Sequence, residues 1–179
     1  MTVQETYKKE ILPKLMMEFS ITNPMAAPKL VKIVVNCGLG EALSDKKVME
    51  KMSIQLGVIT GQKPSITRAK RAISTFKLRA GDAVGLKITL RGSRMHDFLT
   101  RFVSLALPRV RDFRGISSRG FDGKGSYTMG ISEQTIFPEL EYSLVDKTRG
   151  FEVTFVTSAV SPEQTKRLLE LFGMPFSKE

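Results

Sequence analysis

Apolar residues near the N-terminus recur every four positions and predict a helix with one apolar stripe. The stripe consists of Val3, Tyr7, Ile11, Leu15 and Phe19. Pro13 lies within this stretch and lacks the backbone N–H that an uninterrupted helix requires. We therefore expect the helix to kink or to restart near Pro13.

Two later segments carry apolar residues at the same helical spacing. The first is expected to begin after Ser44, as its N-cap, and to end at Gly61. Its apolar positions are Val48, Met49, Met52, Leu56 and Ile59. The second is terminated by Pro108. Its apolar positions are Met95, Phe98, Leu99, Phe102, Val103 and Ala106.

The segment "SPEQTKRLLELFG" predicts a C-terminal helix. Ser161 is expected as the N-cap, with Pro162 at the first helical position and Gln164 completing a capping box. Gly173 stands just past the last apolar residue, where a helix commonly ends.

Alternating apolar and polar residues predict two strands, each with one buried and one open face. The expected buried positions are Val31, Ile33, Val35 and Cys37 in the first, and Val84, Leu86, Ile88 and Leu90 in the second. The expected open positions are Lys32, Val34 and Asn36, and then Lys87, Thr89 and Arg91. The segments "PSITRAK", "SYTMGI" and "FEVTFVTSAV" predict further strands. The open faces are mostly polar or basic.

The order of these elements contains the β-α-β-β-α-β core of split-βαβ folds. We therefore predict an α+β protein, an antiparallel sheet with helices packed on one face and the other face open. Residues 1–179 are expected to form a single domain, because the chain suffices for one ordinary core. Two long basic loops are expected at 68–81 and 109–125.

The net charge of the chain indicates what type of partner the protein binds. The chain has 28 Lys and Arg residues against 18 Asp and Glu, a formal net charge of +10. Such a balance favours a polyanionic partner, with nucleic acid ahead of an anionic membrane surface. No apolar run approaches the roughly 20 residues that span a bilayer, so we expect a soluble protein without membrane contact.

Candidate catalytic and metal-binding residues are few. Cys37 and His96 are single residues of their kinds, which excludes a disulfide and a zinc cluster of Cys and His and fits a reducing, cytoplasmic setting. His96 is expected on the surface or boundary of a helix, and no carboxylate pair stands in an acid/base motif. We expect neither an enzyme nor a cofactor.

Two glycine-containing stretches look like nucleotide-binding loops but lack the required residues. In "VVNCGLGEALS", Leu43 replaces the third small residue of a dinucleotide fingerprint, and no acid follows about 20 residues on. In "GVITGQKPS", Pro64 removes an N–H that a phosphate loop would need. We instead expect Gly38 and Gly40 to let the chain turn sharply and approach another backbone closely.

The stretch "RGFEVTFV" begins like the first ribonucleoprotein motif of RNA-recognition domains. It departs from that motif at Glu152 and Val153, so we interpret Phe151, Val153 and Phe155 as an apolar core stripe.

Cations are concentrated in the two long loops, together with aromatic residues that could stack on bases. The first loop contains Arg68, Lys70, Arg71, Lys77 and Arg79 with Phe76, and the second contains Arg109, Arg111, Arg114, Arg119 and Lys124 with Phe113 and Phe121. Acids gather in a later segment, which would repel phosphate and suit solvent or a basic protein. These acids are Glu133, Glu139, Glu141, Asp146 and Glu152.

Several blocks of the sequence resemble one family in order along nearly the whole chain. They are "NCGLGEA", "GQKPSITRAKRAISTFKLRAG", "ITLRGSRM", "LPRVRDFRGIS" and "FDGKGSYTMGISEQTIFPE". The family is the bacterial large-subunit ribosomal protein five, a 5S rRNA binder.

This resemblance implies a structural protein that helps to attach 5S rRNA in the central protuberance. The implied 5S rRNA-binding residues are Asn36, Gln62, Ser65, Thr67, Thr89 and Arg91. The implied P-site tRNA loop carries Arg68, Lys70, Arg71, Lys77 and Arg79. An intersubunit bridge to small-subunit ribosomal protein thirteen of the head is implied for Arg109, Arg111, Asp112, Glu139, Glu141 and Asp146.

Further implied partners are 23S rRNA and the neighbouring 5S-rRNA-binding ribosomal proteins, and no functional homo-oligomer is expected. Two alternatives remain open. A general RNA-binding chaperone or repressor would bind unrelated structured RNAs nearly as well as 5S rRNA. A nucleotide-binding enzyme would show saturable binding of NAD or ATP.

Overall fold

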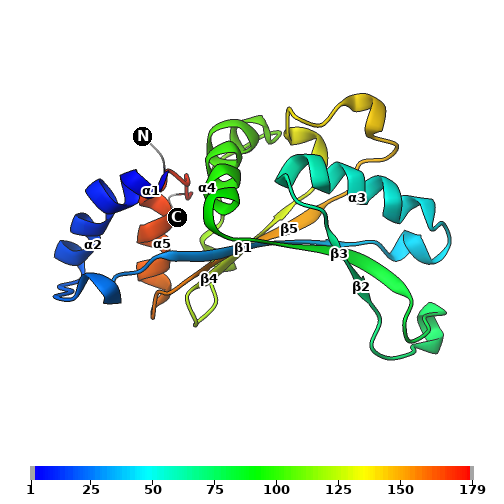
Figure 1. Ribbon diagram of the computed structural model, residues 1–179, viewed down its shortest axis with the longest axis horizontal. Helices are drawn as coiled ribbons and strands as arrows, with labels where there is room; N and C mark the ends of the chain where they lie inside the picture. The colour runs from blue at the N-terminus through cyan, green and yellow to red at the C-terminus, as the bar shows by residue number, and fades with distance from the viewer. Residues whose placement is uncertain (1–2, 178–179) are drawn as a thin grey trace. The chain divides into compact units, whose positions relative to one another are not determined.

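The computed structural model describes residues 3–177 and shows an α+β fold built on one five-stranded antiparallel sheet (Figure 1). The strands are β1 (Leu30–Gly38), β2 (Ser65–Arg68), β3 (Ala83–Leu90), β4 (Ser126–Ile131) and β5 (Phe151–Thr157). The α-helices are α1 (Val3–Thr6), α2 (Leu12–Glu18), α3 (Lys47–Thr60), α4 (Gly92–Arg101) and α5 (Pro162–Leu171). The predicted fold class is confirmed.

The strand order β2-β3-β1-β5-β4 explains which strands form the predicted split-βαβ core. The core consists of β1, α3, β2, β3, α4 and β5, since these four strands give the order 2-3-1-5. It is therefore β5, rather than the preceding β4, that completes the core beside β1. Strand β4 adds an edge beyond it.

The chain divides into two compact units. One contains the chain up to Ile33, Arg91–Met129 and the part from Thr154 onward; the other contains Val34–Leu90 and Gly130–Val153. We refer to them as the terminal unit and the central unit and describe each by itself.

In the terminal unit, the N-terminal helix restarts at the proline as predicted. A π-helical turn, η1 (Tyr7–Ile11), precedes α2, and Pro13 lies in the first turn of α2, where a missing N–H is tolerated. Ile11 and Leu15 pack against Leu168 of α5. The expected apolar stripe is therefore the surface that joins the N-terminal helices to the C-terminal helix.

The C-terminal helix α5 begins almost as predicted. The Ser161 hydroxyl accepts a hydrogen bond from the Gln164 N–H at 3.3 Å. The Gln164 side chain, however, accepts from the Val160 N–H at 3.2 Å and not from that of Ser161. The expected capping box was wrong in this detail, since the reciprocal bond reaches one residue further back.

In the central unit, α3 packs on β3, and its predicted apolar positions are all buried. Gly61 ends the helix with φ of 68°, as expected. Ser44 was wrongly predicted as the N-cap, because the helix starts later and the Asp45 carboxylate accepts the Lys47 N–H at 2.9 Å. A 3-10 turn, η3 (Gly40–Leu43), lies between β1 and this helix.

The predicted role of Gly38 and Gly40 is also wrong. Neither has a positive φ, and a Cβ built on either would meet nothing within 4 Å. The close approach occurs at Gly85 of β3, where a Cβ would lie 2.6 Å from the Cys37 carbonyl oxygen. The glycine that these strands require therefore lies in the partner strand of β1.

Within residues 3–177, none of the helices combines the length and the apolar composition of a membrane span. No group of three or more His, Cys, Asp or Glu in that range is arranged to hold a metal ion.

Candidate RNA interface

Polar side chains of three strands share the open face of the central unit's sheet. β2 and β3 pair with Ser65 opposite Lys87 and Thr67 opposite Gly85, so Ser65, Thr67 and Lys87 point to the same side. Asn36 of β1 is exposed and lies between the buried Val35 and Cys37. We call Asn36, Gln62, Ser65, Thr67, Lys87 and Thr89 the polar face.

The hydrogen-bonding groups of this face are largely uncommitted. Within residues 3–177, the side chains of Asn36, Ser65 and Thr67 have no hydrogen-bond partner. Gln62 is different, because its amide donates to the Thr89 carbonyl at 3.4 Å and ties the end of α3 to β3. The face therefore presents free hydroxyl and amide groups on a rigid strand framework.

Lys87 also belongs to this face, although the 5S rRNA-binding residues implied by the sequence resemblance do not include it. It is exposed at the centre of β3, directly across from Ser65. The alternation along β3 placed it outward, so the signal was present in the sequence. Arg91, by contrast, follows β3 as an exposed residue at the start of α4 in the terminal unit.

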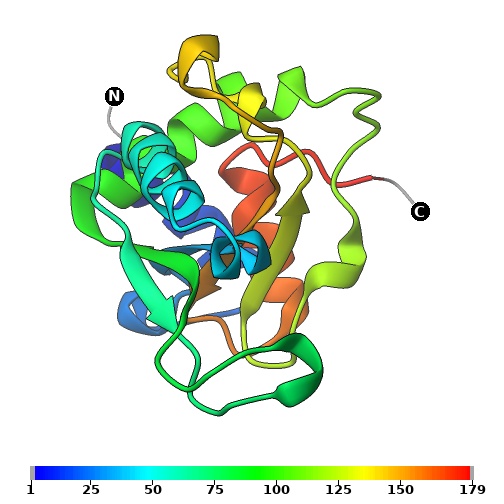
Figure 2. The ribbon, with the colours of Figure 1, turned by 90° about the vertical axis from the view of Figure 1, so that its right-hand side faces the viewer.

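The basic loop, residues 68–81, extends from the ends of β2 and β3 (Figure 2). Its base is fixed, because Ala69 donates to the Asp82 carbonyl at 2.8 Å and the Arg68 guanidinium donates to the Gly81 carbonyl at 2.8 Å. Near the tip, Ile73 and Leu78 pair in an isolated antiparallel bridge around the turn η4 (Ser74–Phe76).

The remaining cations of the basic loop point into solvent. Lys70, Arg71, Lys77 and Arg79 are exposed, and so is the Phe76 ring at 70%. The loop thus combines free positive charge with an aromatic ring available for stacking.

The second basic loop offers fewer aromatic surfaces than predicted. Phe121 packs against Tyr127 and Phe176, with ring centroids 4.5 and 5.5 Å away. It is part of an internal aromatic cluster, so its expected availability for base stacking was wrong. Arg109, Arg111 and Asp112 are exposed, and Asp112 adopts a left-handed backbone with φ of 53°.

Ion pairs hold the acidic segment in place within the central unit. Asp146 accepts from the Arg149 guanidinium at 2.7 Å and lies 3.5 Å from the Lys51 ammonium. The Arg149 hydrogen bond holds the pKa of Asp146 well below its ordinary range. Arg149 also reaches Glu41 at 3.4 Å, and Lys147 pairs with the same carboxylate. The negative charge of Asp146 is therefore neutralised within the protein, and Glu41 neutralises positive charge of the same segment.

Buried glutamines fix the same segment. The Gln55 amide of α3 donates to the Leu144 carbonyl at 2.6 Å, and the Gln134 amide donates to the Lys147 carbonyl at 2.7 Å. These bonds satisfy loop backbone groups inside the protein, which burial would otherwise make costly. Glu141 is exposed and Glu139 half-buried on this anchored segment.

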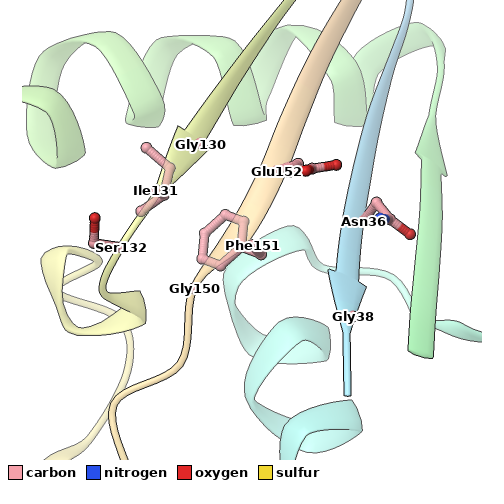
Figure 3. Close-up of a pocket in the computed structure, with 8 residues that line it drawn as sticks. All are labelled: Asn36, Gly38, Gly130, Ile131, Ser132, Gly150, Phe151 and Glu152. Carbon is pink, nitrogen blue, oxygen red and sulfur yellow. The ribbon is translucent and has the colours of Figure 1, made fainter. Parts of the chain in front are cut away.

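Glu152 does not belong with the other acids, contrary to the sequence interpretation. It is exposed on β5 between the buried Phe151 and Val153, so its carboxylate lies on the open side of the strand. Figure 3 shows it in the same hollow as Asn36. The alternation of "FEVTF" contained this signal, but grouping by charge obscured it.

Two other sequence interpretations are confirmed. Phe151, Val153 and Phe155 are all buried, as a core stripe should be. Cys37 is also buried, and burial raises the pKa of its thiol to about 11. Its sulfur donates to the Gly150 carbonyl at 3.3 Å, so it serves packing and not chemistry.

Comparisons with known proteins identify the family. The family model of ribosomal protein L5 matches residues 23–79, and the model of the C-terminus of the same ribosomal family matches residues 83–176. The chain is 55% identical over 172 residues to large ribosomal subunit protein uL5 of Syntrophomonas wolfei, covering 96% of this chain and 97% of the relative. It is 52% identical over 177 residues to uL5 of Clostridium kluyveri, covering 99% and 98%.

A third relative, uL5 of Chloroflexus aurantiacus, is 54% identical over 174 residues, with 97% of each chain covered. The two family models together match residues of both units. These matches, on a fold with an open polar sheet face, show that the chain belongs to the uL5 family of structural proteins of the large ribosomal subunit.

Proposed function

We propose that this ribosomal protein binds 5S rRNA through the polar face and so helps to attach that RNA in the central protuberance. Membership of the uL5 family makes it a structural constituent of the large subunit that binds rRNA. The choice of 5S rRNA rests on the sequence resemblance together with the character of this face.

The uncommitted polar groups on the sheet carry the proposal. Asn36, Ser65 and Thr67 lie on one side of paired strands, and their side chains have no partner in the described part of the chain. A-form RNA presents 2′-hydroxyls and base edges in a wide, shallow minor groove, which such donors and acceptors can bond. Lys87 adds a cation for a flanking phosphate.

We assign the basic loop to P-site tRNA. Its exposed cations and the Phe76 ring project beyond a base that internal hydrogen bonds fix in place. This arrangement suits a backbone contact that positions an RNA without reading its sequence.

We assign contact with small-subunit ribosomal protein thirteen to residues of two segments, all of them exposed except the half-buried Glu139. In the terminal unit these are Arg109, Arg111 and Asp112; in the central unit they are Glu139, Glu141 and Asp146. Internal pairing of Asp146 leaves Glu141 as the more available carboxylate for a basic partner. Contacts with 23S rRNA and with neighbouring 5S-rRNA-binding proteins complete this proposal.

Asn36→Ala tests the polar face directly. We expect weaker 5S rRNA binding in a gel-shift titration, by roughly fivefold or more for the loss of hydrogen bonds from one amide. Stability should be unchanged, because the exposed Asn36 side chain makes no bond within residues 3–177. Gln4→Ala is the matched control, an exposed amide in α1. Equal affinity of Asn36→Ala and the unaltered chain would remove Asn36 from the site.

A further inference from the structure

A hollow of about 410 Å³ lies on the open side of the central unit's sheet. Three short segments surround it: the end of β1, the end of β4 and the start of β5 (Figure 3). Its lining residues are Asn36, Gly38, Gly130, Ile131, Ser132, Gly150, Phe151 and Glu152. Of these residues, only Asn36 belongs to the 5S rRNA-binding set that the sequence resemblance implies.

Glycines keep the hollow open. A Cβ built on Gly38 or Gly130 would meet nothing within 4 Å, so the space above these positions is empty of protein atoms. Gly150 differs, because a Cβ there would lie 2.7 Å from the Ile131 carbonyl oxygen. Two of the three glycines therefore leave room for a planar group to approach the backbone, and the third draws the strands together.

Glu152 is the charged group of this hollow. Its exposed carboxylate has no hydrogen-bond or ion-pair partner within residues 3–177. An ionised carboxylate only accepts hydrogen bonds, so it repels phosphate and requires N–H or O–H donors. On this RNA-binding face, the Glu152 carboxylate is therefore able to accept hydrogen bonds from the edge of a base. It is unable to contact the phosphate backbone of the RNA favourably.

The pattern of hydrogen-bond donors on the base edges indicates which of the four bases fits this carboxylate. On its Watson–Crick edge, guanine presents two adjacent donors, N1–H and the 2-amino group, followed by the O6 acceptor. The other three bases present no pair of adjacent donors. A carboxylate can accept both guanine donors at once, as a bidentate pair, and a neighbouring amide NH₂ can donate to O6. Glu152 and Asn36 supply these two groups from neighbouring strands.

We propose that the hollow binds one unpaired guanine of ribosomal RNA, with the Glu152 carboxylate accepting from its N1–H and 2-amino groups and the Asn36 amide donating to its O6. Unpaired bases are the usual targets of sequence-specific RNA recognition, because their Watson–Crick edges are free. The inference deepens the proposed function, since the natural source of that guanine would be 5S rRNA.

Glu152→Gln distinguishes base recognition from simple charge effects. Removing a negative charge from an RNA-binding surface should strengthen binding or leave it unchanged, if charge alone matters. Recognition of guanine predicts the opposite, a loss of roughly tenfold, the scale of one bidentate base contact. Glu50→Gln, on the exposed side of α3, removes the same charge away from the hollow and serves as control.

Substitution with inosine, which lacks the 2-amino group of guanosine, reveals which guanine is bound. Transcripts of 5S rRNA and of 23S rRNA fragments, sparsely substituted with inosine, are selected for binding to the unaltered chain, to Glu152→Gln and to Glu50→Gln. We expect inosine at one unpaired position to weaken selection by the unaltered chain and by Glu50→Gln. The same substitution should have no effect with Glu152→Gln.

Three results would overturn the inference: no inosine-sensitive guanine, the same sensitivity with Glu152→Gln, or a Glu152→Gln loss that depends on Mg²⁺ and not on inosine. Thermal unfolding of each variant verifies that the fold is retained. If the selected RNA is 23S rRNA and not 5S rRNA, the proposed 5S function fails. The inosine comparison then still decides the guanine site on the RNA that was selected.

Discussion

Gly85 is the residue on which the close approach of β1 and β3 depends. It is buried, and a Cβ there would lie 2.6 Å from the Cys37 carbonyl oxygen and 3.0 Å from the Thr67 hydroxyl. The first neighbour is backbone and cannot turn aside. Thr67 belongs to this contact and Asn36 directly precedes Cys37 in β1, so the geometry of the polar face is set partly by the absence of a side chain at Gly85.

Gly85→Ala should destabilise the protein. Forcing a methyl group into this contact is expected to lower the free energy of unfolding by about 1–3 kcal/mol. Urea unfolding followed by circular dichroism measures the loss as a lower midpoint at unchanged slope. Gly38→Ala is the matched control, since its Cβ would meet nothing within 4 Å. Equal midpoints for the two variants would contradict the assigned role of Gly85.

The contrast between Asn36 and the glycines shows what sequence could predict at this scale. Asn36 was predicted correctly as outward, because period-2 alternation is a local property of the strand. Gly85 was missed, and Gly38 and Gly40 were given its role, because a close approach depends on which strand lies opposite. That information is not local. Glu152 was wrongly grouped with the acidic segment because of its charge. The alternation of buried and exposed residues along β5 instead indicates the open side of the sheet.

The basic loop is the element in which fixed and free parts are most clearly separated. Hydrogen bonds at Ala69, Arg68 and Asp82 hold its base to β2 and β3, whereas its other cations are exposed. The polar face and the loop can therefore be altered independently. Their proposed partners, 5S rRNA and tRNA, are expected to respond independently as well.

Changing Lys70, Arg71 and Lys77 together to Gln tests this separation. We expect 5S rRNA affinity to stay within about threefold, because no phosphate contact on the polar face is lost. Large subunits reconstituted with the variant should bind P-site tRNA more weakly. Lys8, Lys9 and Lys14 changed to Gln remove the same charge from exposed sites in the N-terminal helices and serve as control. Loss of 5S rRNA binding by the loop variant alone would show the loop to be a primary anchor.

Helices and strands were predicted well, but the π-helical turns within them were not. Hydrophobic periodicity located α3, α4, α5 and the strands because it depends on burial of one face. The π-helical turn η1 and the second one, η5 (Phe102–Ala106), were not foreseen, since one extra residue in a turn hardly alters the apolar spacing. The anchoring of the acidic segment by Gln55 and Gln134 was also invisible, because buried amides look like surface residues in a sequence.

At the scale of the whole chain, the order of elements along the sequence predicts the split-βαβ core. The strand order confirms it and identifies β5 as the completing strand. Net charge of +10 indicated the class of partner, and the family comparisons agree with a ribosomal protein. Neither charge nor fold selects one RNA among many, since both act through features that all structured RNAs share.

Selectivity for 5S rRNA is therefore the property that tests the account most directly. Labelled 5S rRNA bound to the full chain at physiological salt is competed with unlabelled 5S rRNA or with an unrelated structured RNA of equal length. We predict that the unrelated RNA will be needed at roughly a hundredfold higher concentration or more, a modest ratio for specific nucleic-acid recognition. Equal competition by the two RNAs would contradict the account and indicate a general RNA-binding chaperone.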